Sequence, residues 1–209
     1  MLKLKNIDLI IIDCVNPNEA IQTLNICTSG IEFGNSIIFT DKNIRPEKHN
    51  HIKIPNLNNI HQYSDFCLKL NKYIDNDYVL IVQNDGFILN ASLWNDIFLK
   101  YDYIGAPWRH TCQIEQKVGN GGFSLRSKKF LQFSSNFDTT NNEPEDNFLC
   151  IRKYNEAIDF GIKYAKSKIA NYFAFEYPNI IEEIFHPERH FGFHGKHNLD
   201  VAYKYIKNK

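Results

Sequence analysis

One carboxylate in the sequence lies shortly after an apolar run and directly precedes a glycine. Asp85 comes after the apolar residues 78–82 and lies between Asn84 and Gly86. Five consecutive apolar residues predict a strand that is buried on both faces, and Gly86 lets another group approach its backbone closely. A carboxylate at the mouth of such a strand is a natural ligand for Mg²⁺ or Mn²⁺, which also bind phosphate oxygens. The pattern therefore predicts a metal and phosphate site at Asp85.

Two further aspartates end apolar runs in the same way. Asp13 follows residues 9–12, and Asp41 follows residues 36–40. Ligands of open α/β sheets bind beyond the carboxyl ends of the parallel strands, which makes both positions candidates. Strands also end in Asp because its side chain forms turns, so a cap or turn role stays open for each of them.

A glycine-rich bend is the next candidate. Gly119, Gly121 and Gly122 fall within four positions, and residues 123–126 read as the strand after the bend. The segment is neither a Walker A loop, because no Gly-Lys-Ser/Thr follows, nor a GxGxxG motif after a first strand. Its glycines either clear space for the flat face of a ligand or form a bulge.

An acidic pair follows a proline at residue 144. Glu145 and Asp146 occupy the first turn of a predicted helix, where the helix dipole favours acidic side chains for purely structural reasons. The same carboxylates are also sufficient for one general base. Both interpretations stay open from the residues alone.

The last candidates are a histidine near the C-terminus and a tryptophan on a turn. His194 lies in the aromatic segment 191–197, two residues before Lys196, and Trp108 follows Gly-Ala-Pro. A histidine among phenylalanines is commonly a packed, hydrogen-bonded ring, but a closing segment here can supply a nitrogen ligand and a phosphate-facing cation. Trp108 is either a core residue or a platform for the apolar face of a sugar.

The elements that position these residues alternate between strands and helices. Asn16 and Pro17 read as the cap and first position of a helix that ends near Gly30. The order strand, helix, strand is the signature of a parallel sheet, so we expect an α/β fold: one domain over residues 1–209 with a central, mostly parallel sheet flanked by helices. Other predicted elements are helices at 60–74, 94–99 and 144–154, a strand at 103–108, a helix capped by Ser127, and a polar connection at 42–57.

Composition excludes several classes of protein. The chain has 209 residues, 43% hydrophobic and 23% charged, with 24 basic and 24 acidic side chains. A formal net charge of +0 argues against a nucleic-acid binder, which needs surplus positive charge. Five cysteines without a CxxC pair argue against a disulfide framework. No apolar run reaches membrane length, so we expect a cytoplasmic protein, with contact at a membrane surface still open.

Taken in order, five motifs give the sequence a family resemblance: residues 83–86, 101–108, 119–126, 144–146 and 191–195. Together they resemble an uncharacterised bacterial family of glycosyltransferase-like proteins and, more distantly, the GT-A superfamily of nucleotide-sugar-dependent transferases. The resemblance spans residues 8–198 and is most specific over residues 79–148.

The resemblance implies a donor site. GT-A enzymes bind a divalent cation with a DxD motif at a strand end, and Asp85 matches the last Asp of that motif, although Gln83 occupies the first position. His194 matches the histidine that commonly completes such a Mn²⁺ or Mg²⁺ site, and Lys196 matches a phosphate contact. The nucleoside of the nucleotide-sugar donor would lie against Val15, Asn16 and, more weakly, Asp41.

The resemblance also implies an acceptor site. Gly121 and Gly122 would border the saccharide or glycan acceptor, with Trp108 as its aromatic platform. Asp146 would be the catalytic base of an inverting transfer, and Glu145 would position the acceptor. The expected activity is sugar transfer from a nucleotide sugar to an acceptor hydroxyl. The alternatives are a nucleotide-sugar hydrolase or pyrophosphorylase-like enzyme, and a non-catalytic carbohydrate-binding module.

Overall fold

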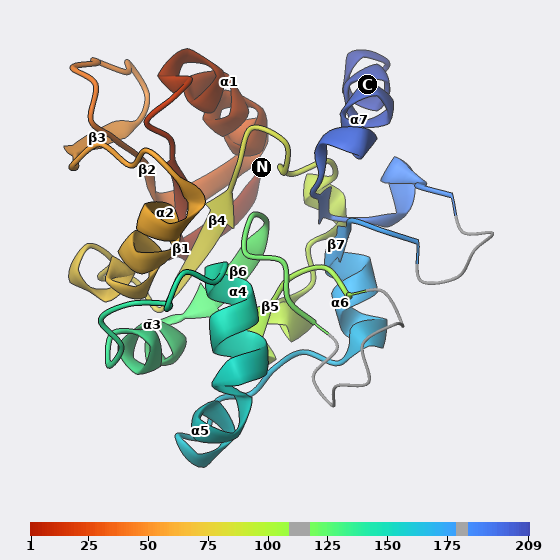
Figure 1. Ribbon diagram of the computed structural model, residues 1–209. Helices are drawn as coiled ribbons and strands as arrows, with labels where there is room; N and C mark the ends of the chain where they lie inside the picture. The colour runs from red at the N-terminus through yellow and green to blue at the C-terminus, as the bar shows by residue number, and fades with distance from the viewer. Residues whose placement is uncertain (109–117, 179–183) are drawn as a thin grey trace.

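A mixed six-stranded sheet forms the centre of the protein. The computed structural model describes residues 1–108, 118–178 and 184–209. The strand order is β3-β2-β1-β4-β6-β5 (Figure 1), and the first four strands are parallel, whereas β6 runs antiparallel to both of its neighbours. The strands of this sheet are β1 (Leu2–Ile12), β2 (Ile31–Thr40), β3 (Asn50–Lys53), β4 (Tyr78–Val82), β5 (Tyr103–Ile104) and β6 (Ser124–Ser127). The chain thus has the predicted α/β fold with a mostly parallel sheet.

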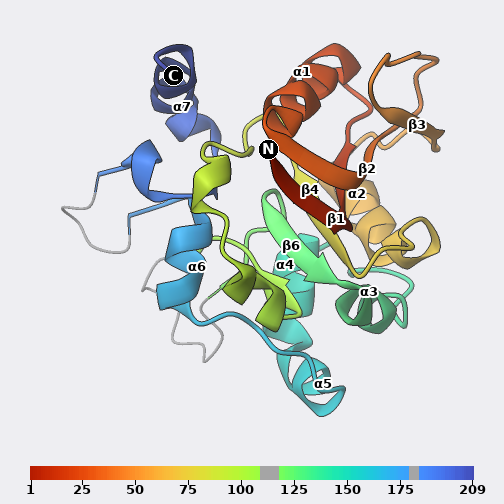
Figure 2. The same cartoon turned by 180° about the vertical axis from the view of Figure 1, so that it is seen from behind.

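Helices cover both faces of the sheet because its central strands are apolar on both faces. Leu9 and Ile11 of β1 belong to the core cluster that includes Leu24 of helix α1, whereas Ile10 and Ile12 belong to the cluster that includes Cys67 of helix α2. Figures 1 and 2 show α1 and α7 at one end of the molecule and α5 at the other. The helices are α1 (Pro17–Thr28), α2 (Ile60–Leu68), α3 (Lys128–Ser134), α4 (Glu145–Asn147), α5 (Tyr154–Asp159), α6 (Ser167–Phe173) and α7 (Leu199–Lys207).

Short, non-α helical turns connect several of these elements. A π-helical segment, Phe148–Arg152, joins α4 to α5, and Lys153 N–H donates to the Phe148 carbonyl at 2.8 Å. The 3₁₀ turns are Leu70–Lys72, Ala91–Leu93, Asp96–Lys100, Pro187–Arg189 and Lys196–Asn198. A small parallel sheet pairs β7 (Ala174–Phe175) with β8 (Gly192–Phe193), so the C-terminal segment packs on the end of α6.

Several sequence predictions need correction. The polar connection at 42–57 contains β3, which pairs with β2 through its backbone despite its polar residues. The helix expected over 60–74 ends at Leu68 and continues as a 3₁₀ turn. The helix expected over 94–99 is the 3₁₀ turn Asp96–Lys100, and the strand expected over 103–108 is only two residues long. The helical preferences of single residues do not show where an α-helix changes into a 3₁₀ turn or where a strand ends early.

Other predictions are confirmed. Helix α1 begins at Pro17, β4 covers residues 78–82, and the Ser127 hydroxyl accepts a hydrogen bond from Phe130 N–H at the start of α3. Cys14, Cys27, Cys67 and Cys150 are buried free thiols, and Cys112 lies outside the described residues. None of the helices in residues 1–108, 118–178 and 184–209 is long and apolar enough to cross a bilayer.

The central strands dominate the stability of the sheet. Leu80 in β4 is 0% exposed, so Leu80→Ala should lower the free energy of unfolding by about 2–5 kcal/mol through lost burial and a new cavity. Urea denaturation measures this change. Ile158→Ala, at a position that is 44% exposed, is the control and should change the free energy by no more than about 0.5 kcal/mol. Equal effects of the two substitutions would contradict this account of the core.

Candidate functional site

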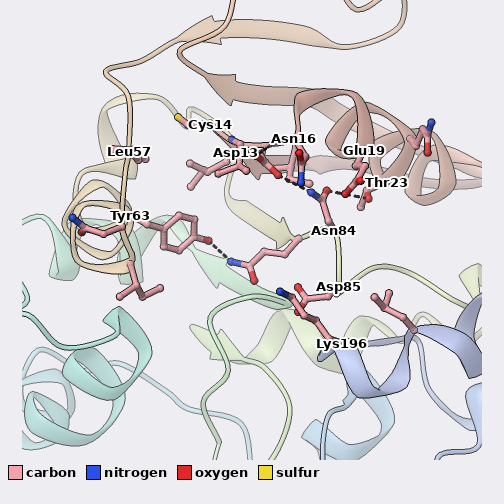
Figure 3. A pocket seen from close by; sticks show the side chains of 18 of the residues that line it. Asp13, Cys14, Asn16, Glu19, Thr23, Leu57, Tyr63, Asn84, Asp85 and Lys196 are labelled. Carbon is pink, nitrogen blue, oxygen red and sulfur yellow. Dashed lines mark hydrogen bonds between the residues drawn. The ribbon is translucent and has the colours of Figure 1, made fainter.

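A cavity of about 810 Å³ opens beyond the carboxyl ends of β1 and β4. Its wall combines the start of α1, the start of α2, the turn after β4 and the C-terminal segment that leads into α7 (Figure 3). The lining includes Asp13, Cys14, Val15, Asn16, Glu19, Gln22, Thr23, Asn58, Asn59, Tyr63, Gln83, Asn84, Asp85, Lys196, Leu199 and Tyr203. This is where ligands of open α/β sheets bind, and the size suits a small-molecule ligand.

Asp13 shapes the loop between β1 and α1. Its Oδ1 accepts hydrogen bonds from the backbone N–H groups of Val15 and Asn16, each at 2.7 Å, and its Oδ2 accepts one from Asn84 Nδ2 at 2.6 Å. Asp13 therefore has the turn role that the sequence left open, because its side chain accepts hydrogen bonds from the two backbone N–H groups of the loop. With its loop fixed in this way, Val15 stays 76% exposed at the cavity.

The turn after β4 is tight and presents Asp85 at its tip. Gln83 and Gly86 exchange two backbone hydrogen bonds of 2.9 Å, so Asn84 and Asp85 occupy the corner. The Asp85 carbonyl accepts a hydrogen bond from Gly195 N–H at 2.8 Å. A methyl group on Gly86 would come within 2.7 Å of His194 Cδ2, so the glycine is what lets the C-terminal segment reach this turn.

His194 meets this turn from the far end of the chain. Its Nε2 lies 3.1 Å from Gln83 Oε1, although the residues are 111 positions apart, and 3.6 Å from Asp85 Oδ1. Its Nδ1 lies 3.0 Å from Glu176 Oε1. Burial acts to lower the pKa of His194, but the Glu176 hydrogen bond and the negative charge of Asp85 outweigh it, so the pKa is raised.

The orientation of Gln83 completes this arrangement. Gln83 Nε2 donates to the Tyr63 hydroxyl at 2.9 Å, which leaves its Oε1 facing His194. When His194 Nδ1 donates to Glu176, a neutral ring presents a lone pair at Nε2. The Nε2 lone pair, Gln83 Oε1 and Asp85 Oδ1 then form a cluster of three acceptors that needs either a proton or a cation between them.

Carboxylate, amide and imidazole atoms are the types of ligand that a divalent cation can take. The separation of 3.1 Å between His194 Nε2 and Gln83 Oε1 is that of adjacent ligands around an octahedral ion with bonds of about 2.1 Å, whereas Asp85 Oδ1, at 3.6 Å from Nε2, would have to move closer. Glu176 contacts the other ring nitrogen, as a carboxylate commonly does behind a ligating histidine. Across residues 1–108, 118–178 and 184–209, no group of three or more His, Cys, Asp or Glu side chains is placed to hold a metal. The protein would therefore contribute Asp85, His194 and the Gln83 amide oxygen, and other ligands would have to come from a bound molecule or water.

The glycine bend packs directly against this cluster. A methyl group on Gly122 would lie 2.2 Å from His194 Nε2 and 2.5 Å from Gln83 Oε1, so no side chain fits there. Gly121 N–H donates to Asp146 Oδ2 at 3.1 Å. The predicted acceptor wall and the predicted base are thus in direct contact with each other.

The two acidic residues of the pair differ in environment. Glu145 is 3% exposed and forms an ion pair of 2.5 Å with Arg126, which is equally buried. Burial raises the pKa of Glu145, opposed by the positive charge of Arg126. Asp146 is half-buried, and its negative charge helps to raise the pKa of His194. Asp146 is therefore the more accessible carboxylate on this side of the site.

Of the predicted site residues, the cavity is lined by Val15, Asn16, Asp85 and Lys196. The predicted residues outside its lining are Asp41, Trp108, Gly121, Gly122, Glu145, Asp146 and His194. Asp41 pairs with Lys42 through Oδ2 at 2.8 Å, an interaction that lowers its pKa. Trp108 packs against Gly119, where a methyl group would lie 1.8 Å from the indole. Lys196, by contrast, lies beside Asp85 at the cavity (Figure 3).

Sequence reasoning missed Tyr63, Arg126 and Glu176. Arg126 carried a readable signal, because a charged side chain within a short strand is rarely buried without a partner. Tyr63 and Glu176 carried none, since each acts through a residue that is distant in the sequence.

A comparison with protein families covers most of these residues. Residues 48–194 match the family described as "Protein of unknown function (DUF5672)". The chain belongs to the DUF5672 family. A sequence comparison with curated proteins found no match.

Solved structures show where this DUF5672 chain stands among known folds. The galactosyltransferase LgtC, in complex with donor and acceptor sugar analogs, is similar with a TM-score of 0.53 and 13% identity over 96% of this chain and 95% of that chain. A glycosyltransferase involved in glycosylation of the major capsid of PBCV-1 matches with a TM-score of 0.52 and 11% identity over 96% and 98%. GlyE of Streptococcus pneumoniae matches with a TM-score of 0.52 and 10% identity over 95% and 59%. The fold is that of GT-A glycosyltransferases.

The contact between Glu176 and His194 predicts a measurable titration. Glu176→Gln removes the charge that raises the pKa of His194, so that pKa should fall, as followed by NMR titration of the ring. A raised folded-state pKa stabilises the fold below the unfolded value of about 6.5, and this stabilisation is lost as pH rises through the folded pKa. The variant should therefore lose more stability at pH 5.5 than at pH 8.5.

Glu156→Gln is the matched control for this titration. Glu156 lies on α5, where it pairs with Lys153, and should leave the pKa of His194 unchanged. An unchanged pKa in Glu176→Gln would show that the carboxylate does not act on His194 in solution.

Proposed function

We propose that this chain is a glycosyltransferase that moves a sugar from a nucleotide-sugar donor to a hydroxyl of a saccharide or glycan acceptor. The observation on which this rests is the approach of His194 to within 3.6 Å of Asp85, at the edge of a cavity large enough for a nucleotide sugar. Fold similarity to LgtC, whose structure contains donor and acceptor sugar analogs, supports the same class of reaction.

The donor would lie along the cavity. Val15 and Asn16 would contact the nucleoside, because Asp13 holds their loop open at the end of β1. The diphosphate would reach Asp85 and Lys196, whose ammonium group offers a positive charge to phosphate oxygens. Asp41 lies outside the cavity lining, so any contribution from it would be indirect.

Asp85 and His194 would hold Mn²⁺ or Mg²⁺, assisted by the Gln83 amide oxygen. When bound, the cation supplies positive charge to the diphosphate as the sugar leaves. Glu176 keeps the ring of His194 oriented, and Tyr63 keeps the Gln83 oxygen directed toward it. Both contacts reduce the reorganisation that ligand binding would require.

Asp146 would act as the base of an inverting transfer. The acceptor oxygen would form a bond to the anomeric carbon, the bond from that carbon to the diphosphate oxygen would break, and the hydroxyl proton would pass to the Asp146 carboxylate. Gly121 and Gly122 would form the wall beside the acceptor, where the absence of side chains lets Glu145 and His194 pack against the bend. Trp108, which packs on Gly119, would flank that wall.

The base assignment predicts a selective loss of turnover. Asp146→Asn keeps the shape of the side chain but cannot take a proton, so kcat should fall by about 100-fold or more while donor affinity stays within about threefold. Glycoside formation from a panel of nucleotide sugars and saccharide acceptors measures the first, and calorimetry with nucleoside diphosphates measures the second. New glycoside that depends on added acceptor also separates transfer from hydrolysis.

Asp138→Asn is the control, because Asp138 is an exposed carboxylate with a lysine partner outside the site. It should leave both quantities unchanged. Near-normal kcat in a folded Asp146→Asn protein would remove Asp146 from the base role, and absence of nucleotide binding by the unaltered protein would favour a carbohydrate-binding module.

Metal dependence provides a separate test. If Asp85 holds the cation, both Asp85→Asn and omission of Mn²⁺ should weaken binding of uridine or guanosine diphosphate by about tenfold or more, and their effects should not add. Asp159→Asn, an exposed carboxylate on α5, is the control. Equal affinity with and without Mn²⁺ would mean that the site binds the donor without a divalent cation.

A further inference from the structure

Arg126 is a buried arginine in the middle of β6. Its side chain is 1% exposed, in a strand that pairs with β4 on one side and β5 on the other. An arginine stays charged in proteins, so burying one is unfavourable unless partners satisfy its planar group. The groups that hydrogen-bond to Arg126 therefore indicate which part of the protein it stabilises.

The hydrogen-bond partners of Arg126 among the described residues lie in the glycine bend, in β6 directly after it, and next to the predicted base. Its Nη2 donates to Glu145 Oε1 at 2.5 Å and to the Gly121 carbonyl at 3.3 Å, and its Nε donates to the Ser124 hydroxyl at 3.0 Å. The Ser124 hydroxyl itself donates to the same Gly121 carbonyl at 3.0 Å. Arg126 therefore contacts the Gly121 carbonyl in two ways: by a direct hydrogen bond, and through the hydroxyl group of Ser124.

The other side of Gly121 contacts Asp146. Gly121 N–H donates to Asp146 Oδ2 at 3.1 Å, so one residue receives Arg126 at its carbonyl and holds Asp146 at its amide. A methyl group on Gly121 would lie 2.0 Å from Glu145 Oε1, which leaves Gly121 no room to shift toward Glu145.

We infer that Arg126 is a positioning residue for the transfer reaction: acting through Gly121 and Ser124, it fixes the carboxylate of Asp146 beside the acceptor wall, with Glu145 as its buried counter-ion. The inference rests on the proposed function, and it assigns Glu145 a place beneath the wall. Glu145 then positions the acceptor indirectly, by holding the arginine that holds Gly121.

The geometry indicates why this matters for turnover. A base acts only within hydrogen-bond reach of the hydroxyl proton, and a displacement of about 1 Å can lower a rate by about 100-fold. Asp146 lies in the first turn of the helical segment that α4 begins, where its side chain is only half-buried. The hydrogen bond from Gly121 ties the Asp146 carboxylate to the bend that precedes β6.

Two substitutions loosen this tie to different degrees. Ser124→Ala removes the bridge between Arg126 and Gly121 without exposing a charge, and Arg126→Lys keeps the charge but lacks the fork needed to reach three acceptors together. We expect kcat to fall by about three- to tenfold in Ser124→Ala and by about 10- to 100-fold in Arg126→Lys. The KM for the donor should stay within about threefold in both, and hydrogen exchange in residues 119–124 should accelerate.

A charge-neutral double variant separates positioning from stability. Replacing a buried ion pair by uncharged groups of similar volume often preserves stability, so Arg126→Met combined with Glu145→Gln should recover much of the melting temperature lost in Arg126→Met alone. The kcat should stay low, because nothing then holds the Gly121 carbonyl. Arg152→Met, which removes an exposed arginine from the segment following α4, is the control and should leave kcat and exchange unchanged.

Three results would overturn the inference: unchanged kcat in Arg126→Lys, unchanged exchange and kcat in Ser124→Ala, or recovery of kcat together with stability in the double variant. The exchange measurement needs no activity, so it reports on the tie even if the unaltered protein transfers no sugar. Lack of transfer by the unaltered protein would reject the proposed function, whereas active variants with accelerated exchange would reject only the positioning role.

Discussion

The candidate site depends on the contact between the turn after β4 and the C-terminal segment around β8. Phe193 N–H donates to the Phe87 carbonyl at 3.3 Å, and Gly195 N–H donates to the Asp85 carbonyl at 2.8 Å. The rings of Phe87 and Phe193 pack edge-to-face at 4.7 Å and are both fully buried. These apolar contacts stabilise a crossing that sets His194 beside Asp85, so burial of two phenylalanines determines the place of the polar groups.

The charged groups of the site differ in their depth below the protein surface. The negative charges of Asp85, Glu176 and Asp146 all act to raise the pKa of His194, and Glu176 also accepts a hydrogen bond from its ring. Arg126 compensates Glu145 deeper in the protein, away from solvent. The proposed donor, which is negatively charged, would therefore meet Asp85 as well as Lys196, and a bound cation would relieve its repulsion from Asp85. Under the proposed function, this repulsion is a physical reason for the cation to arrive with the diphosphate rather than to be held beforehand.

Part of this site was predictable from local sequence because it depends on strand ends. The apolar run before Asp85, the start of α1 at Pro17, and the glycine bend are all encoded within a few residues of where they act. Asn16 occupies the predicted cap position, but its side chain makes no capping hydrogen bond. The ends of β1 and β4 then had to lie at one edge of the sheet. By contrast, β3 pairs through its backbone, and its polar side chains gave no strand pattern. The partners Tyr63 and Glu176 depend on the crossing of distant segments, which no local pattern records.

The π-helical segment between α4 and α5 has a consequence for how the acidic pair and the adjoining core coexist. A π turn accommodates one residue more than an α turn, and each added residue rotates the helix before it by about 100° relative to the helix after it. Phe148, Leu149 and Cys150 are consecutive and all buried. Because of the extra residue, the side chains of α4 point in directions that differ by this rotation from those of an uninterrupted α-helix continuing into α5. Glu145 and Asp146 can then face the glycine bend while the apolar residues that follow face the core. A single-residue deletion in this segment would turn one of these two groups away from its partners.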